Sequence, residues 1–145
     1  MNAIQEQEII SAMTLARLGF YHLAAILQLY RKAGSAKAVI DHRHHVRDLF
    51  PEASQRLVDV MRDCDAMRQR AEEELAYDQA HGIMPLTMAD PAYPRRLAEC
   101  DDAPLVLYYK GTADLNQSHV INIVGTRKCT QYGQDLIRQI GRAHV

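Results

Sequence analysis

Paired cysteines, a strong net charge and a long apolar run are all missing from this sequence, and each absence removes a class of protein. The chain has 145 residues and 3 cysteines, Cys64, Cys100 and Cys129. Their odd number and wide spacing exclude paired metal-ligand motifs and argue against a disulfide framework, so we expect a reducing, cytoplasmic location. The formal net charge is −1, so a nucleic-acid binder of this composition must concentrate its cations locally. No segment has the length and apolar character that crossing a bilayer requires, and we expect no membrane association.

Residues with catalytic or metal-binding side chains also lack the partners that such chemistry needs. The histidines of Asp41-His-Arg-His-His45 lie in a polar stretch without matching acids or thiolates, so we assign no metal site. Asp101 and Asp102 are neighbours whose side chains point apart, and the following Ala-Pro indicates a turn. No nucleophile is paired with a base. We therefore expect no catalytic residue and no cofactor.

The first part of the chain has apolar residues at helical spacing. One face consists of Ile9, Ile10, Met13, Leu15 and Leu18, and a second of Leu23, Ile26, Leu27 and Tyr30. Ser35 suits the start of a third helix over residues 36–40, and Pro51 suits the first turn of a fourth. Gly82 suits the end of a longer helix. The pattern predicts a helical domain over residues 1–82.

From residue 83 onward the apolar pattern becomes strand-like. Residues 83–88, 105–109 and 120–124 are short apolar runs, and the last is almost wholly β-branched, which is typical of a parallel strand buried on both faces. Three strands and one following helix begin a doubly wound sheet but are too few to complete one. We therefore predict an incomplete parallel α/β domain over residues 83–139.

The junction after residue 124 is the strongest candidate for a binding site. Gly125 permits a tight turn at the end of the third strand, and Thr130 suits the N-cap of a helix that runs from Gln131 towards Ile140. Ligands of open α/β sheets bind in this crevice, where free helix-start N–H groups favour anions. The phosphate-binding set that we predict is Gly125, Thr126, Arg127 and Lys128. Because the glycines at 125 and 133 lack the spacing of a dinucleotide fingerprint or a P-loop, the loop alone is a weak signal.

Two linked groups of motifs make the signal more specific. The first contains Tyr93-Pro-Arg-Arg-Leu97, Asp102-Ala-Pro104 and an apolar run that ends in Lys110-Gly111. The second contains Val124-Gly-Thr-Arg127, with Tyr132-Gly133 behind it. In this order and at these separations, the motifs over residues 93–133 resemble those of the DprA/Smf DNA-processing family.

The resemblance implies both a fold and a function. It implies an N-terminal helical domain similar to a sterile alpha motif, followed by a Rossmann-like domain. It also implies that the protein binds single-stranded DNA, delivers it to a RecA-type recombinase in natural transformation, forms a homodimer at full length and catalyses no reaction. In that role Arg127 would fork onto phosphate oxygens and Lys128 would add a point charge. Gly125 would allow close approach, and Thr126 would fix the position of the DNA backbone.

Two other functions stay open at this point. A Rossmann-type nucleoside-monophosphate phosphoribohydrolase also carries a glycine-serine loop after its first strand, but it needs a downstream Pro-Gly-Gly-x-Gly-Thr motif. In the other alternative, the helical part is a protein-interaction module to which the α/β part is merely attached. Residues 140–145 match one translated frame of a common sequencing adapter. We therefore interpret them as non-native and exclude Arg142 and His144 from every site.

Overall fold

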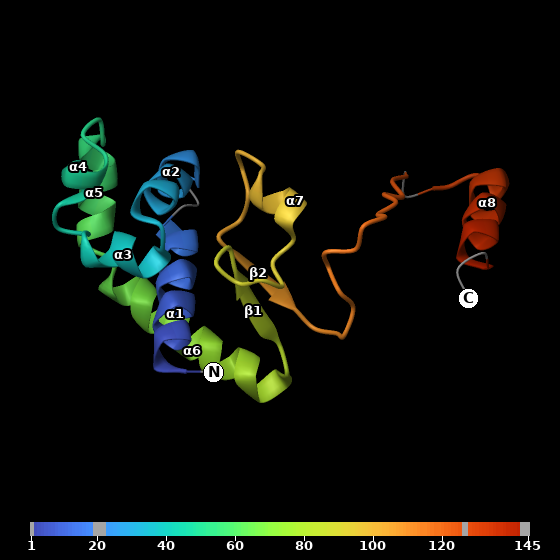
Figure 1. The fold of residues 1–145 in the computed structure, drawn as a ribbon, viewed down its shortest axis with the longest axis horizontal. Coiled ribbons are helices and arrows are strands. Elements are labelled where there is room, and N and C mark those ends of the chain that lie inside the picture. The colour runs from blue at the N-terminus through green and yellow to red at the C-terminus, as the bar shows by residue number, and fades with distance from the viewer. Residues whose placement is uncertain (1, 19–22, 126–127, 143–145) are drawn as a thin grey trace.

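The structure is a computed structural model that describes residues 2–18, 23–125 and 128–142. Within these residues, six helices come first, followed by two strands with a short helix between them and then by a last helix. The order is α1 (Ala3–Leu18), α2 (Leu23–Ala33), α3 (Ala36–Asp41), α4 (Val46–Leu49), α5 (Gln55–Arg62), α6 (Asp65–His81), β1 (Met84–Thr87), α7 (Arg95–Ala98), β2 (Val106–Tyr109) and α8 (Gln131–Arg142). Figure 1 shows α1–α5 on one side of the two strands, α6 running below them, and α8 standing apart on the other side.

The helix ends follow from local capping chemistry. Ser35 Oγ accepts a hydrogen bond from Ala38 N at 3.1 Å, which confirms the predicted start of α3. Ser54 Oγ accepts one from Leu57 N at 3.2 Å and begins α5. The prediction for Pro51 was wrong, because this residue lies in the turn before Ser54 rather than in the first turn of the helix. Gly82 ends α6 in the left-handed conformation with φ of 65°, as its position predicted.

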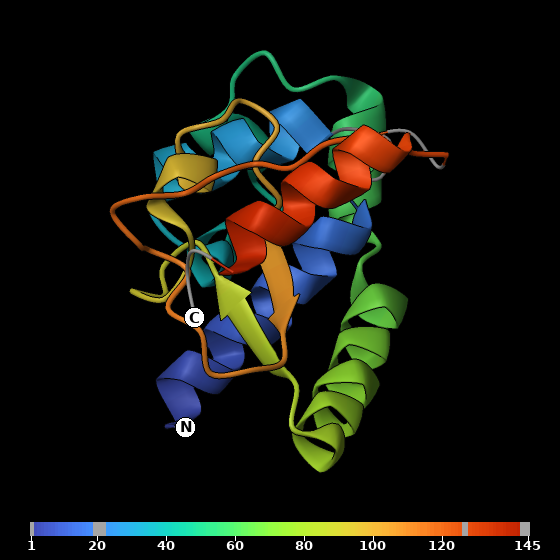
Figure 2. The ribbon, with the colours of Figure 1, turned by 90° about the vertical axis from the view of Figure 1, so that its right-hand side faces the viewer.

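Helix α1 lies at the centre of the core. Its second half is buried on nearly all sides, because Ile10, Met13, Leu15 and even Thr14 are covered by neighbouring elements. Thr14 satisfies its hydroxyl group within the helix by donating to Ile10 O at 2.7 Å. The same hydrophobic core continues past the helices into Ala103, Leu105 and Val106. The helices and the sheet therefore share one core, and Figure 2 shows both strands lying across α1.

The sheet differs from the prediction in its direction. Strands β1 and β2 pair antiparallel, with Met84 opposite Tyr109 and Leu86 opposite Leu107. A parallel pair needs a crossover that returns the chain to the same end of the sheet, usually along a helix. The only described helix between these strands is α7, which has four residues. The connection instead doubles back on itself, since Tyr93 donates its hydroxyl to Pro104 O at 2.6 Å.

The predicted third strand is also absent from the described structure. Residues 120–124 have no regular secondary structure and pair with no strand. Their apolar side chains stay in solvent, with Val120 55%, Ile121 66%, Ile123 57% and Val124 92% exposed. A strand needs a neighbour to pair its backbone and a covering layer for its side chains. Neither reaches this segment within the described residues, so its apolar pattern does not produce a strand here.

Within the described ranges, none of the helices combines the length and the apolar surface needed to cross a membrane.

Asp78 on α6 is 3% exposed, and its Oδ2 atom has no hydrogen-bond partner in the described chain. Burial raises the pKa of this carboxyl group above its ordinary value, while the nearby His81 lowers it more weakly.

We expect Asp78→Asn to raise the free energy of unfolding at pH 7. A group whose pKa is raised in the folded state contributes stability below its unfolded pKa and loses that contribution as the pH rises through the folded value. Ionised Asp78 therefore opposes folding at neutral pH, and the gain from the substitution should shrink as the pH falls towards the ordinary carboxyl value of 3.8. Urea unfolding across this pH range measures the difference in the free energy of unfolding between the variant and the original chain. Glu52→Gln, which removes an exposed carboxylate, is the control; equal effects of the two substitutions would contradict the prediction.

We expect Tyr93→Phe to destabilise the fold by about 1 kcal/mol, the usual net value of one hydrogen bond. Tyr93 is 2% exposed, whereas Tyr132 is 76% exposed, so Tyr132→Phe should have no effect. Burial raises the pKa of Tyr93 to about 12, with smaller contributions from Cys100 and Tyr30. The tyrosine's contribution should therefore persist up to about pH 10 and disappear as the pH rises through about 12. A Tyr93→Phe variant that is as stable as the original chain in urea unfolding at pH 8 would refute the role given to this hydroxyl.

Candidate nucleic-acid interface

The loop that the sequence singled out is only partly within the described structure. Gly125 and Lys128 are described and exposed, while Thr126 and Arg127 lie outside the described residues. Gly125 does not have a positive φ, and a Cβ atom placed there would meet no described atom within 4 Å. A tight turn is therefore not the reason for glycine at this position. What the residue does provide is bare, accessible backbone beside an exposed lysine.

Helix α8 begins where the capping pattern predicted. Thr130 Oγ1 accepts a hydrogen bond from Gly133 N at 3.2 Å, and Gln134 N donates to Thr130 O at 3.1 Å. The first N–H groups of a helix have no partner within the helix and carry a partial positive charge. No acidic residue lies in the first turn of α8. The helix start therefore adds a favourable potential for an anion to the charge of Lys128.

Apolar side chains on both sides of this loop are uncovered. Before it come the four exposed β-branched residues of the segment 120–124. After it, α8 exposes Tyr132, Leu136 and Ile137, at 76%, 43% and 45%, and their spacing puts them on one face of the helix. The loop thus joins an extended segment and an amphipathic helix that both present apolar surface, as expected for a strand and helix without covering layers.

The turn that carries Tyr93 is fastened to the following loop by one asparagine. Asn116 Oδ1 accepts from Arg95 N at 2.9 Å, and Asn116 Nδ2 donates to Tyr93 O at 3.1 Å. Arg31 on α2 holds the other end of α7 by donating to Cys100 O at 2.8 Å, and its guanidinium lies 3.7 Å from Asp101. Asp101 is exposed and makes this one ion pair, so the structural role of the two neighbouring aspartates stays a prediction. Sequence reasoning missed Asn116, because nothing local to an asparagine in a polar loop reveals contacts made 20 or more residues away.

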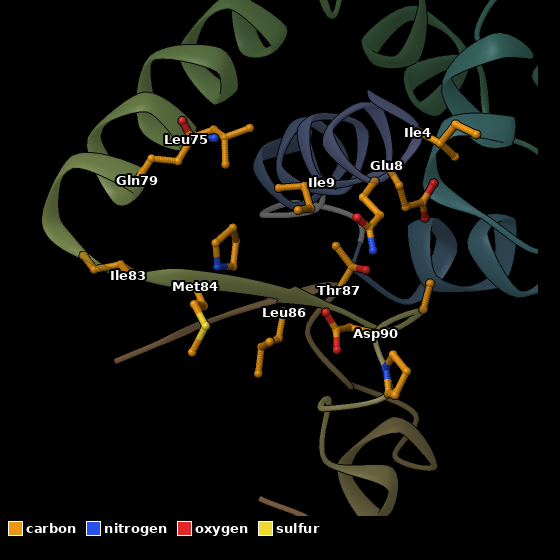
Figure 3. A pocket seen from close by; sticks show the side chains of 14 residues that line it. Ile4, Glu8, Ile9, Leu75, Gln79, Ile83, Met84, Leu86, Thr87 and Asp90 are labelled. Carbon is orange, nitrogen blue, oxygen red and sulfur yellow. The ribbon is translucent and has the colours of Figure 1, made fainter. Parts of the chain in front are cut away.

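Another hollow in the described structure lies away from the loop and is mostly apolar. It has a volume of about 630 Å³ and runs along β1 between α1 and α6. Figure 3 shows Leu75 and Ile9 on one side of β1 and Met84 on the other. No lysine, arginine or histidine is among the described residues that line it. It therefore has no side chain to neutralise a phosphate and is a poor site for nucleic acid.

Within the hollow along β1, the two carboxylates are already engaged with backbone. Glu8 accepts hydrogen bonds from Ala36 N at 2.7 Å and Lys37 N at 2.9 Å. Asp90 accepts one from Ala92 N at 2.8 Å, which closes a turn. Across the described part of the chain, no three histidine, cysteine, aspartate or glutamate side chains come together in an arrangement that suits a metal ion.

Comparison with known proteins points to the second part of the chain. A family model described as DNA recombination-mediator protein A matches residues 84–145. The chain is 35% identical over 54 residues to the DNA processing protein DprA of Streptococcus pneumoniae (strain ATCC BAA-255 / R6), a match that covers 37% of this chain and 19% of that protein. It is 44% identical over 64 residues to Protein Smf of Synechocystis sp. (strain ATCC 27184 / PCC 6803 / Kazusa), covering 41% and 16%. No solved structure matches the chain.

The matched residues coincide with the motifs found in the sequence. The family match includes the Tyr93 turn, β2, the segment 120–124 and α8. The alignments span less than a fifth of either relative, at 19% and 16%. Residues 84–145 of the chain are therefore similar to the DprA/Smf family.

Proposed function

We propose that this protein acts in DNA processing during recombination by binding single-stranded DNA and delivering it to a RecA-type recombinase in the cytoplasm. The observation that carries the proposal is the family match, which runs through the loop containing Gly125 and Lys128. The names of the two relatives and of the family model support the DNA-processing part. The recombinase and a homodimer at full length follow from the family resemblance and are part of the same proposal.

The binding chemistry that we propose is electrostatic capture of the DNA backbone. Lys128 is exposed beside accessible backbone at Gly125, and the capped start of α8 favours an anion. Arg127, next to Lys128 in the sequence, adds a planar guanidinium that binds two phosphate oxygens at once. Thr126 and the loop N–H groups fix the position of the phosphate. Contacts of this kind do not read the bases, so binding should be independent of sequence.

The uncovered apolar surfaces fit a larger Rossmann-like domain. We propose that residues 120–124 form a parallel strand when the remaining strands of such a domain are present, and that α8 packs on the resulting sheet through Tyr132, Leu136 and Ile137. The exposed β-branched side chains of the segment 120–124 support this, because they are the pattern of a strand buried on both faces. The loop at residues 125–128 would then lie at the carboxyl end of that strand, where such sheets bind ligands.

Catalysis is not part of the proposal. A positively charged loop that holds a backbone phosphate needs no nucleophile and no general base to perform its task. The enzymatic alternative, a nucleoside-monophosphate phosphoribohydrolase, would release a free base from its substrate. Incubating the chain with nucleoside monophosphates and separating the products by chromatography distinguishes the two, and we expect no base to be released.

We expect Arg127→Ala to weaken binding of single-stranded DNA by about 1–3 kcal/mol, similarly for unrelated sequences. Lys128→Ala should have a smaller effect in the same direction, because a lysine makes a point contact rather than a fork. Each substitution should also reduce the slope of log affinity against log salt concentration by about 0.7, the value for one phosphate on a single strand. Fluorescence anisotropy with two unrelated labelled oligonucleotides at several salt concentrations measures all of these effects.

The control for these substitutions is Arg62→Ala, which removes an exposed arginine at the end of α5, away from the loop. It should leave both the affinity and the salt slope unchanged. If Arg127→Ala behaves like Arg62→Ala, the loop is not the DNA-binding site. If the loss depends strongly on base sequence, backbone capture is the wrong mechanism.

A further inference from the structure

A second hollow lies between the turn that carries Tyr93 and the loop that follows β2. It has a volume of about 570 Å³, within the size range of small-molecule sites, and it opens between residues 94–97 and residues 115–122. We call it the arginine hollow, because Arg95 and Arg96 are the charged residues among those that line it. It shares no lining residue with the predicted loop at residues 125–128.

The two walls of the arginine hollow are held together by specific hydrogen bonds. Asn116 on one wall accepts from Arg95 N at 2.9 Å and donates to Tyr93 O at 3.1 Å on the other. Arg96 Nη2 donates to Ser118 O at 2.9 Å across the same gap. The hollow is therefore a preformed feature of the fold, since closing or opening it would break these contacts.

The charge of the arginine hollow favours an anion. No aspartate or glutamate lines it, and in the described chain the exposed guanidinium of Arg95 has no hydrogen-bond or ion-pair partner. The nearby Asp114 is turned to other groups, because it accepts from Asn116 N at 2.8 Å and from Gln117 Nε2 at 3.1 Å. An uncompensated arginine in a pocket without acids is well suited to a phosphate group.

The lining also contains aliphatic side chains that can pack against a nucleobase. Leu97 is half-buried at the base of the turn, and Leu115 and Val120 are exposed at 36% and 55%. Cations and aliphatic side chains in one hollow match the phosphate and the base of a nucleotide. Asn122 and Gln117 add polar groups that can donate to or accept from a base edge.

We infer that the arginine hollow binds one nucleotide unit, with its phosphate on Arg95 and Arg96 and its base against Leu97, Leu115 and Val120. The unit is either a free nucleoside monophosphate or one nucleotide of a single strand that also passes the loop at residues 125–128. The second source rests on the proposed function, whereas the first does not. In the strand, the hollow adds a contact separate from the loop, which lengthens the DNA that one chain holds.

The cysteines of the chain provide a test that reports on both sites at once. Cys100 is exposed and lines the arginine hollow, Cys129 is exposed next to Lys128, and Cys64 is buried. Alkylation rates of the three thiols in the 145-residue chain are measured with iodoacetamide and peptide mass spectrometry. The rates are compared without any ligand and in the presence of thymidine monophosphate, thymidine without phosphate, or a thymidine oligonucleotide.

We expect thymidine monophosphate to slow alkylation of Cys100 several-fold and to leave Cys129 unchanged, while thymidine has no effect. The oligonucleotide should slow both Cys100 and Cys129. Arg95→Ala should abolish protection of Cys100 by the monophosphate and leave protection of Cys129 by the oligonucleotide intact. The matched control Arg62→Ala, which removes an exposed arginine of α5, should retain both effects.

The outcomes separate the two proposals. Protection of Cys129 without protection of Cys100 by any addition overturns the arginine hollow and leaves the loop standing. Protection of Cys100 that depends on Arg95, without protection of Cys129, supports the hollow and overturns the loop. Arg95-dependent protection of Cys100 by the oligonucleotide but not by the monophosphate assigns the hollow to single-stranded DNA alone. Protection of Cys100 that survives Arg95→Ala contradicts the inference.

Discussion

The hydrogen bond from the buried Tyr93 hydroxyl to Pro104 O is the contact on which the second part of this fold depends. It closes the connection between β1 and β2 on itself, in keeping with the antiparallel pairing of the two strands. The same turn then offers its backbone to Asn116, which fixes the loop after β2. The turn that carries Tyr93 therefore joins the two strands and leads into one wall of the arginine hollow.

The turn that carries Tyr93 is held in place by contacts with the helices. Arg31 of α2 holds the carbonyl at Cys100, and Leu105 and Val106 complete a core that begins in α1. The residues that match the DprA/Smf family thus pack against the helices on one side. On the other side, the segment 120–124 and α8 carry apolar side chains exposed to solvent. In the function we propose, that uncovered side is completed by the rest of the domain, and the phosphate-binding loop lies at the boundary between the two.

The sequence predicted the features that depend only on residues close together in the chain. The cap at Ser35, the left-handed glycine at Gly82 and the start of α8 at Thr130 were all predictable, because each depends on residues within one helical turn. The family resemblance was also correct, since it rests on linear motifs.

Interactions between residues far apart in the chain could not be predicted from the sequence. A strongly apolar run predicts a strand, but the run at 120–124 has no described partner and stays unpaired. Parallel and antiparallel pairing give the same local pattern for a short run, and the Tyr93 contact that closes the connection between the strands spans 11 residues. The pair Arg95 and Arg96 was visible only as part of a motif, because the hollow that gives it meaning is formed by the later loop at residues 115–122. Thr126 and Arg127 stay predictions.

The central claim is that the hairpin of β1 and β2 is one cooperative unit with the helices, while the segment before the loop is uncovered. Native-state hydrogen exchange of the 145-residue chain tests it most directly, because it resolves the free energy of opening at each amide. The protected amides of β1, β2 and α1 should exchange with a common free energy equal to that of global unfolding, and those of residues 120–125 should exchange almost without protection. A hairpin that opens at a much lower free energy than α1, or strong protection at 120–125, would contradict this account.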